Sequence, residues 1–161
     1  MTRALFFERK GFGVCKVQKI YVDAYCIVKN AHIKGRVGYG KSACGVLILD
    51  VYGNEYEFTK YLGEKTVPQA ELEGLVFALD KACEVLNRKT PIEVWSDSDL
   101  VVKWMTKVNR IKKEHIKPIY DDANQKAQRF TSVEYFHHSR STPEAQRADK
   151  LAHMEYEKHN K

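Results

Sequence analysis

The sequence lacks any long apolar run, low-complexity tract or internal repeat. A helix that crosses a bilayer needs about 20 consecutive apolar residues. No segment of the 161 residues approaches that length, so no membrane partner is expected. The first ten residues carry two Arg, one Lys and one Glu without a following apolar stretch, which is unlike a secretory signal. A cytoplasmic location is therefore expected.

Cysteine is scarce, with four residues, and none forms a CxxC pair or lies at zinc-finger spacing from a histidine. A zinc site is therefore not expected. A disulfide framework is not required either, because a chain of this length can bury a sizeable core within one domain. The cysteines at 15, 26, 44 and 83 are expected to be free thiols, buried or half-buried.

Acidic residues are fewer than basic ones, 21 against 27, which gives a formal net charge of +6. An excess of Lys and Arg favours polyanionic partners, chiefly nucleic acids, because their binding releases condensed counterions. The composition is otherwise that of a soluble globular protein. No small-molecule cofactor is expected, and the chain is expected to act as a monomer.

Hydrophobic periodicity divides the chain into an N-terminal extension, residues 1–16, and one domain, residues 17–161. Strands are expected from Val17 onward and over Cys44–Val51, Glu55–Leu62, Ile92–Ser96 and Ser132–His137. Helices are expected over the apolar run from Leu72 to Leu86, from Asp97 or Ser98, over Lys113–Phe130, and from Pro143 toward Glu157. The polar stretch Lys29–Ser42 indicates a loop or an irregular strand end.

The resulting order, β-β-β-α-β-α-α-β-α, begins with a hairpin that turns at Gly53-Asn54. Strands linked by helices follow it. This order predicts an α/β protein with a mixed sheet and helices on its faces. The first and fourth strands can be neighbours at the point where the strand order reverses, and acidic residues on both would then meet.

Two aspartates lie on those strands. Asp23 has the opposite parity to Val22 within the first strand, and a buried charge there is costly unless it is paired or bound to metal. A solvent-facing aspartate is the alternative. Asp97 follows the fourth strand, at the carboxyl end where ligands gather in open α/β sheets. It could equally cap the next helix.

Further carboxylates fall on two of the expected helices. Glu71 and Glu73 lie near the start of the first helix, and periodicity does not choose between them. Asp149 lies on the closing helix beside Ala148 and could line a site or be a plain surface charge. Clustered carboxylates repel one another unless cations neutralise them, and such an oxygen set suits Mg²⁺.

Four short motifs resemble those of the type I ribonuclease H (ribonuclease HI) family. They are Tyr21-Val22-Asp23, Gln69-Ala70-Glu71-Leu72, Ser96-Asp97-Ser98 and Arg147-Ala148-Asp149-Lys150-Leu151-Ala152. The resemblance extends from Val17 to the end and is to the compact form without a long basic protrusion. It implies a ribonuclease H-like fold, with a five-stranded mixed sheet, its first three strands antiparallel, flanked by helices.

The resemblance also implies an activity: hydrolysis of the RNA strand of an RNA–DNA hybrid, leaving a 3′-hydroxyl and a 5′-phosphate. It implies two Mg²⁺ ions, for which Mn²⁺ could substitute, in a two-metal-ion mechanism. By this resemblance Glu71 is the site residue rather than Glu73. Asp23 would contact both ions, Glu71 and Asp97 mainly one, and Asp149 the ion that activates water.

The chain departs from the family in the loop after the first acid. Ala24-Tyr25-Cys26 stands where the family has a glycine-rich segment, and Asn30 is the candidate for its loop asparagine. His138 and Arg140 are the candidate auxiliary residues. These departures keep two alternatives open: a weak or inactive nucleic-acid-binding module on the same fold, or a nuclease or resolvase that acts on DNA.

Basic residues follow Asp97 along the chain and could bind the DNA strand, with Trp104 packed on a sugar or base. The alternative is a solvated basic face with Trp104 in the core. The nucleic-acid-binding candidates are Asn30, Gln69, Lys103, Trp104, Lys107, Lys112 and Lys113.

Overall fold

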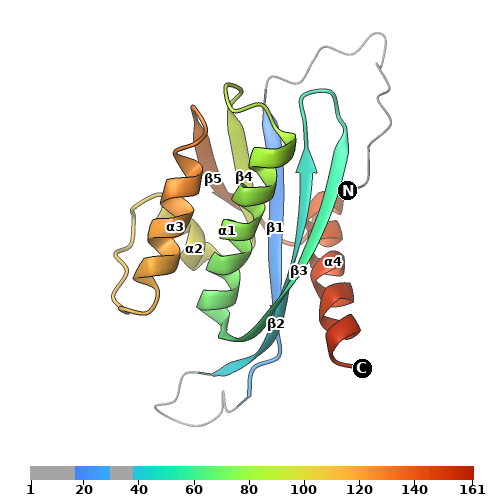
Figure 1. The fold of residues 1–161 in the computed structure, drawn as a ribbon, viewed down its shortest axis with the longest axis vertical. Coiled ribbons are helices and arrows are strands. Elements are labelled where there is room, and N and C mark those ends of the chain that lie inside the picture. The colour runs from blue at the N-terminus through green and yellow to red at the C-terminus, as the bar shows by residue number, and fades with distance from the viewer. Residues whose placement is uncertain (1–16, 30–37) are drawn as a thin grey trace.

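One mixed β-sheet organises the computed structural model, which describes residues 17–29 and 38–161. The predicted N-terminal extension and Asn30 lie outside the described residues. The elements are β1 (Gln18–Cys26), β2 (Tyr39–Leu49), β3 (Glu55–Thr66), α1 (Val67–Val85), β4 (Ile92–Ser96), α2 (Asp99–Met105), α3 (Lys117–Ala127), β5 (Val133–His137) and α4 (Pro143–His159) (Figure 1). Their order is the one the sequence predicts.

The sheet has five strands in the order β3-β2-β1-β4-β5. β1 pairs antiparallel with β2, and β2 antiparallel with β3. β4 is parallel to both β1 and β5. The predicted fold class is confirmed. The carboxyl ends of β1, β4 and β5 consequently lie at one edge of the sheet, and β1 meets β4 where the strand order reverses, a place where α/β sheets bind ligands.

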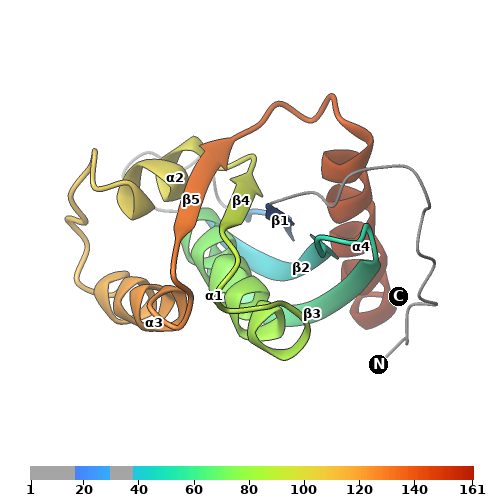
Figure 2. The same ribbon diagram turned by 90° about the horizontal axis from the view of Figure 1, so that it is seen from above.

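Helices cover both faces of the sheet. α1 and α3 lie on one face and α4 on the other, beside β1, β2 and β3 (Figure 2). Alternation along β1 sets these contacts, because Val22 packs in the core with Leu72 of α1, whereas Tyr21 packs with Ala148 of α4. None of the described helices is both long enough and apolar enough to pass through a membrane.

Several element boundaries differ from those predicted. β2 begins at Tyr39 and β3 continues to Thr66, and these ends pair with each other. A register shift at Ser42/Ala43 interrupts their ladder, so the irregular strand end is the correct alternative for residues 39–42. α3 covers Lys117–Ala127, shorter than the predicted Lys113–Phe130, because no side chain caps it and Pro118 lies within its first turn.

Gly45 lets α4 lie directly against the sheet. It is the partner of Asp23 in the β1–β2 ladder. A Cβ atom at this position would lie 2.3 Å from the carbonyl oxygen of Ala148 and 2.6 Å from the backbone nitrogen of Ala152. Both alanines are fully buried. The small residues therefore place the helix that carries Asp149 over the strand pair that carries Asp23.

We expect Gly45→Ala to lower the free energy of unfolding by about 1–3 kcal/mol, because α4 must move away from β2. Thermal unfolding should show a Tm decrease of roughly 2–12 °C. Gly74→Ala is the matched control. Its Cβ would meet side-chain atoms alone, the nearest being the Cβ of Cys44 at 3.3 Å and Cγ2 of Val22 at 3.5 Å, and alanine favours the helix. Equal Tm values for Gly45→Ala and the wild type would contradict this close packing.

Candidate metal centre

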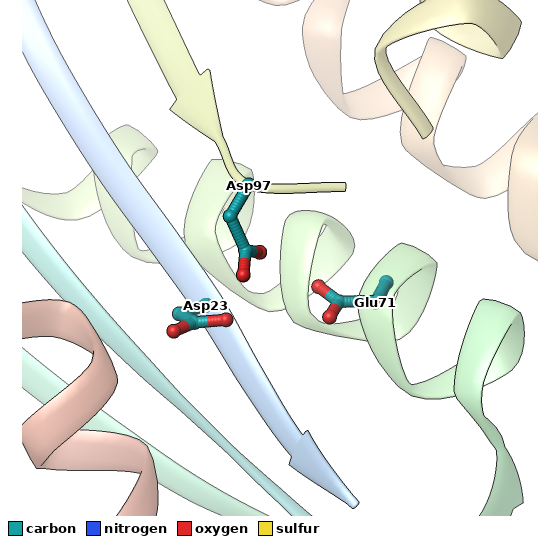
Figure 3. A group of neighbouring side chains, drawn as sticks. All are labelled: Asp23, Glu71 and Asp97. Carbon is teal, nitrogen blue, oxygen red and sulfur yellow. The ribbon is translucent and has the colours of Figure 1, made fainter. Parts of the chain in front are cut away.

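Strand register places Asp97 beside Asp23. The last pair between β1 and β4 is Val22 with Ser96. β4 ends there, while β1 continues for four more residues to Cys26. Asp97 is therefore the first residue beyond β4, next to Asp23 (Figure 3). It does not cap the following helix, since Ser98 Oγ accepts the hydrogen bond from the Val101 backbone.

Glu71 reaches the same place from α1. A capping box between Thr66 and Gln69 fixes the start of this helix. The backbone of Ala24, on the part of β1 beyond the end of β4, hydrogen-bonds the Glu71 carboxylate and offsets a small part of the rise in its pKa that burial causes. Glu73 instead forms an ion pair with Lys65 at 3.2 Å. The geometry thus selects Glu71 of the two candidates.

Asp23, Glu71 and Asp97 converge. One carboxylate oxygen from each lies within 4.8 Å of the other two (Figure 3). Asp23 is 1% exposed, so the solvent-facing alternative is wrong. Both of its carboxylate oxygens, and Oδ1 of Asp97, are buried without a hydrogen-bond partner among the described residues. Buried polar atoms of this kind call for a ligand or a proton.

Proton binding in this cluster is strongly favoured. Burial, reinforced by the charges of Asp97 and Glu71, raises the pKa of Asp23 to about 10. Burial and the charge of Asp97 raise the pKa of Glu71 well above its usual range. Two ionised carboxylates cannot donate to each other, so a hydrogen bond between Asp23 and an acidic neighbour would require that one of the two is protonated.

Asp149 lies at the margin of the cluster. Burial and the charges of Asp97 and Glu71 are the main causes of the raised pKa of Asp23, and nearby Asp149 adds to them. Asp149 is not part of the group of three that lies within 4.8 Å. Its Oδ1 atom lies 3.4 Å from Nε2 of His153. The four candidate acids therefore come together, three closely and one through Asp23.

Arg140 supplies positive charge at the site. Its Nε and Nη2 atoms donate to Oδ2 of Asp97 at 3.0 and 2.9 Å. His138 lies deeper, at 6% exposure, and its Nε2 atom is buried without a partner among the described residues. Burial lowers the pKa of His138. Of the two auxiliary candidates, only Arg140 contacts one of the acids directly.

Sequence reasoning missed three residues around the acids. His137, the partner of Ser96 in the β4–β5 ladder, has its Nε2 atom 3.0 Å from the Asp97 carbonyl oxygen. The rings of Tyr25 and His153 are in tilted contact, and His153 lies beside Asp149. Two signals in the sequence could have indicated them: His137 ends its strand as Asp97 follows its own, and His153 lies four residues after Asp149, on the same face of a helix.

The donor set fits a hard divalent cation. The three converging groups offer carboxylate oxygens alone, the ligands that Mg²⁺ and Mn²⁺ prefer. The buried oxygens of Asp23, which have no hydrogen-bond partner among the described residues, could act as ligands to such a cation. Asp23, Glu71 and Asp97 are the residues that could hold such a cation.

The predicted nucleic-acid contacts have different surroundings. Lys103 forms an ion pair with Asp99, and Gln69 accepts a hydrogen bond from the Thr66 backbone in the capping box. Trp104 is 7% exposed and packs in the core. Its exposed edge lines a hollow of about 520 Å³, together with Arg110, Lys112, Lys113 and residues at the start of α1. Lys107 is exposed just beyond α2. Contact with nucleic acid stays a prediction for all of them.

A family model described as "Reverse transcriptase-like" matches residues 32–155. The chain belongs to this family. Within it, the ribonuclease HI type is supported by solved structures of type 1 ribonucleases H, which share the five-stranded mixed sheet. No curated protein sequence matches the chain.

Three solved structures of ribonucleases H are similar to this chain in fold. LC11-RNase H1, isolated from compost by a metagenomic approach, is 26% identical with a TM-score of 0.75, covering 91% of this chain and 99% of that one. RNase H1 from the halophilic archaeon Halobacterium salinarum NRC-1 is 24% identical with a TM-score of 0.73, covering 88% and 98%. The RNase H domain of PFV is 20% identical with a TM-score of 0.61, covering 87% and 94%.

Proposed function

We propose that this protein hydrolyses the RNA strand of RNA–DNA hybrids in a reaction that depends on divalent metal ions. The observation that carries the proposal is the convergence of Asp23, Glu71 and Asp97, with unpartnered buried oxygens, at the carboxyl ends of β1 and β4. The reverse transcriptase-like family and the ribonuclease H fold support it. A structure of LC11-RNase H1 in complex with an RNA/DNA hybrid, 26% identical to this chain, supports the choice of substrate.

The four acids are proposed to hold the metal, each fixed by a different part of the chain. β1 carries Asp23, α1 carries Glu71, Asp97 follows the end of β4, and α4 carries Asp149 over Gly45. Two Mg²⁺ ions, with Mn²⁺ as a substitute, would neutralise these acids and stabilise the attacking and leaving oxygens of an in-line displacement. The products would carry a 3′-hydroxyl and a 5′-phosphate.

The protein's remaining part in the reaction is to position the duplex. Exposed Lys107, Lys112 and Lys113 can contact phosphates of the DNA strand without reading its sequence. The hollow next to Trp104 adjoins the start of α1, the helix that carries Glu71. A strand held there would run toward the acids. The 2′-hydroxyl and the groove shape would distinguish RNA from DNA.

The purified protein with Mg²⁺ or Mn²⁺ is expected to cut a labelled RNA strand paired with DNA and to leave double-stranded DNA and double-stranded RNA intact. A chelator should abolish cutting, because the cluster then lacks the charge that the reaction needs. Cleavage products resolved on a denaturing gel provide the measurement. Chelator-insensitive binding without cutting would favour a binding module instead, and cutting of DNA would favour a DNA-directed nuclease.

A further inference from the structure

Tyr25 and His153 form a close contact next to the acids. Their ring centroids lie 3.7 Å apart with an interplanar angle of 35°. Tyr156 packs edge-on against the other side of the tyrosine, at 5.0 Å and 83°. Tyr25 is two residues beyond Asp23 on β1, and His153 is four residues beyond Asp149 on α4. The contact thus joins the two elements that carry these acids.

The spacing along the two elements matches. Residues two apart on a strand share a face and are separated by about 6.6 Å. Residues four apart on a helix also share a face and are separated by about 6 Å. Asp149 lies near enough to Asp23 to add to the rise in its pKa, after burial and the charges of Asp97 and Glu71. Tyr25 contacts His153 one step further along both elements. The aromatic contact therefore fixes the distance and register between the acids.

His153 also touches Asp149 directly. Its Nε2 atom lies 3.4 Å from Oδ1 of Asp149, so an Nε2–H can donate to this oxygen. The Asp149 side chain is 30% exposed and the His153 side chain 40%. A half-exposed aspartate on a helix would otherwise sample several rotamers, at an entropic cost when it binds a ligand. The His153 ring, packed against Tyr25, holds one orientation of the Asp149 side chain in advance.

We propose that Tyr25 and His153 act as a positioning pair that fixes the Asp149 carboxylate beside Asp23 and so sets the affinity of the site for divalent metal. This inference rests on the proposed function, because it concerns the same site. The pair is built from two contacts, the ring contact of Tyr25 with His153 and the 3.4 Å approach of His153 to Asp149.

The test is Mn²⁺ binding by isothermal titration calorimetry, together with kcat and KM for hybrid cleavage. Tyr25→Ala and His153→Ala are expected to raise the Kd for Mn²⁺ about tenfold or more, the usual effect of removing an outer-shell partner. We expect kcat to fall in parallel while KM stays within about twofold. Tyr25→Phe keeps the ring and should restore wild-type values. In an Asp149→Asn background, His153→Ala should change Kd no further.

The chain offers a matched control further along α4. Tyr61 of β3 stacks on His159 at 4.3 Å and 14°, and His159 pairs with Glu155 at 3.1 Å, four residues before it. This trio repeats the chemistry of Tyr25, His153 and Asp149 away from the three converging acids. Tyr61→Ala and His159→Ala should therefore leave Mn²⁺ affinity unchanged, provided that circular dichroism confirms folding of all variants.

Two results would overturn the proposal: unchanged Mn²⁺ affinity in Tyr25→Ala and His153→Ala, or an equal loss in the Tyr61 and His159 variants. The second result would mean that general packing of α4, rather than positioning of Asp149, is being measured. Should the wild type bind Mn²⁺ but cut no hybrid, the proposed function fails, while the Kd comparison still decides the role of the pair. A wild type that binds no Mn²⁺ would contradict both the proposed function and the positioning role of Tyr25 and His153.

Discussion

Replacing Asp23 by Asn is expected to increase the stability of the metal-free protein and to abolish nuclease activity. Burial and two neighbouring carboxylates make an ionised Asp23 unfavourable in the folded state. An amide has nearly the same shape, carries no charge and can donate to Asp97 or Asp149. We expect the free energy of unfolding to rise by about 2 kcal/mol and Tm by roughly 4–8 °C. Hybrid cleavage should fall about 10³-fold or more, because the residue proposed as the central metal ligand is lost.

Asp121→Asn is the matched control for this prediction. It makes the same chemical change at an exposed position of α3, across the sheet from α4. Its stability and activity should stay close to wild type. Thermal unfolding in a chelating buffer and cleavage of a labelled hybrid measure the two effects. A lower Tm for Asp23→Asn would show that Asp23 is not destabilised by its neighbours. Retained cleavage would show that Asp23 is not required for the reaction.

The stabilisation should depend on pH in a defined direction. Asp23 has a pKa of 3.8 when unperturbed and about 10 in the folded protein, so the folded state binds more protons than the unfolded state between these values. The free energy of unfolding of the metal-free wild type should therefore fall as pH rises from about 4 toward 10. Asp23→Asn should weaken this slope, so that its advantage is larger at pH 8 than at pH 5.

Much of the fold follows from patterns that are local in the sequence. Ile92–Ser96 is a short, mainly apolar segment preceded by Pro91, and the structure has a strand over the same five residues. Thr142-Pro143 combines a helix cap with a favoured first residue, and α4 begins at Pro143. Boundaries that depend on tertiary pairing were less accurate. Tyr39 joins β2 because β3 offers it a partner at Thr66, which no local pattern encodes.

The geometry of the candidate site was harder to predict from the sequence, because it depends on β4 ending at Ser96 while β1 continues to Cys26. Alternation shows that Asp23 and Val22 face opposite sides, yet Asp23 meets Glu71 of α1 because β1 continues past the end of β4. Periodicity left Glu71 and Glu73 equivalent, and the Ala24 backbone and Lys65 distinguish them. The contact between Tyr25 and His153 joins residues 128 positions apart by their numbers, which only the packing of α4 on the sheet brings together.

Metal affinity is expected to rise steeply with pH. A cation can bind the Asp23 and Glu71 carboxylates only after their protons leave, and the pKa of each group is raised. If one proton is released for each ion bound, the Kd for Mg²⁺ should fall about tenfold per pH unit, or about a hundredfold from pH 6 to pH 8. Titration calorimetry in two buffers of different ionisation enthalpy counts the protons directly.

Glu73→Gln is the control, because this acid lies on the same helix but pairs with Lys65. It should keep both the proton release and its pH slope. A Kd that is independent of pH would mean that the cluster is already ionised, with Arg140 and solvent supplying the balancing charge. Proton release on metal binding would instead show that the burial which disfavours ionised Asp23 and Glu71 also limits metal binding, and with it the proposed nuclease activity, at low pH. The unpartnered carboxylate oxygens of Asp23 and Asp97 would then bind the cation only after it has displaced a proton from the cluster.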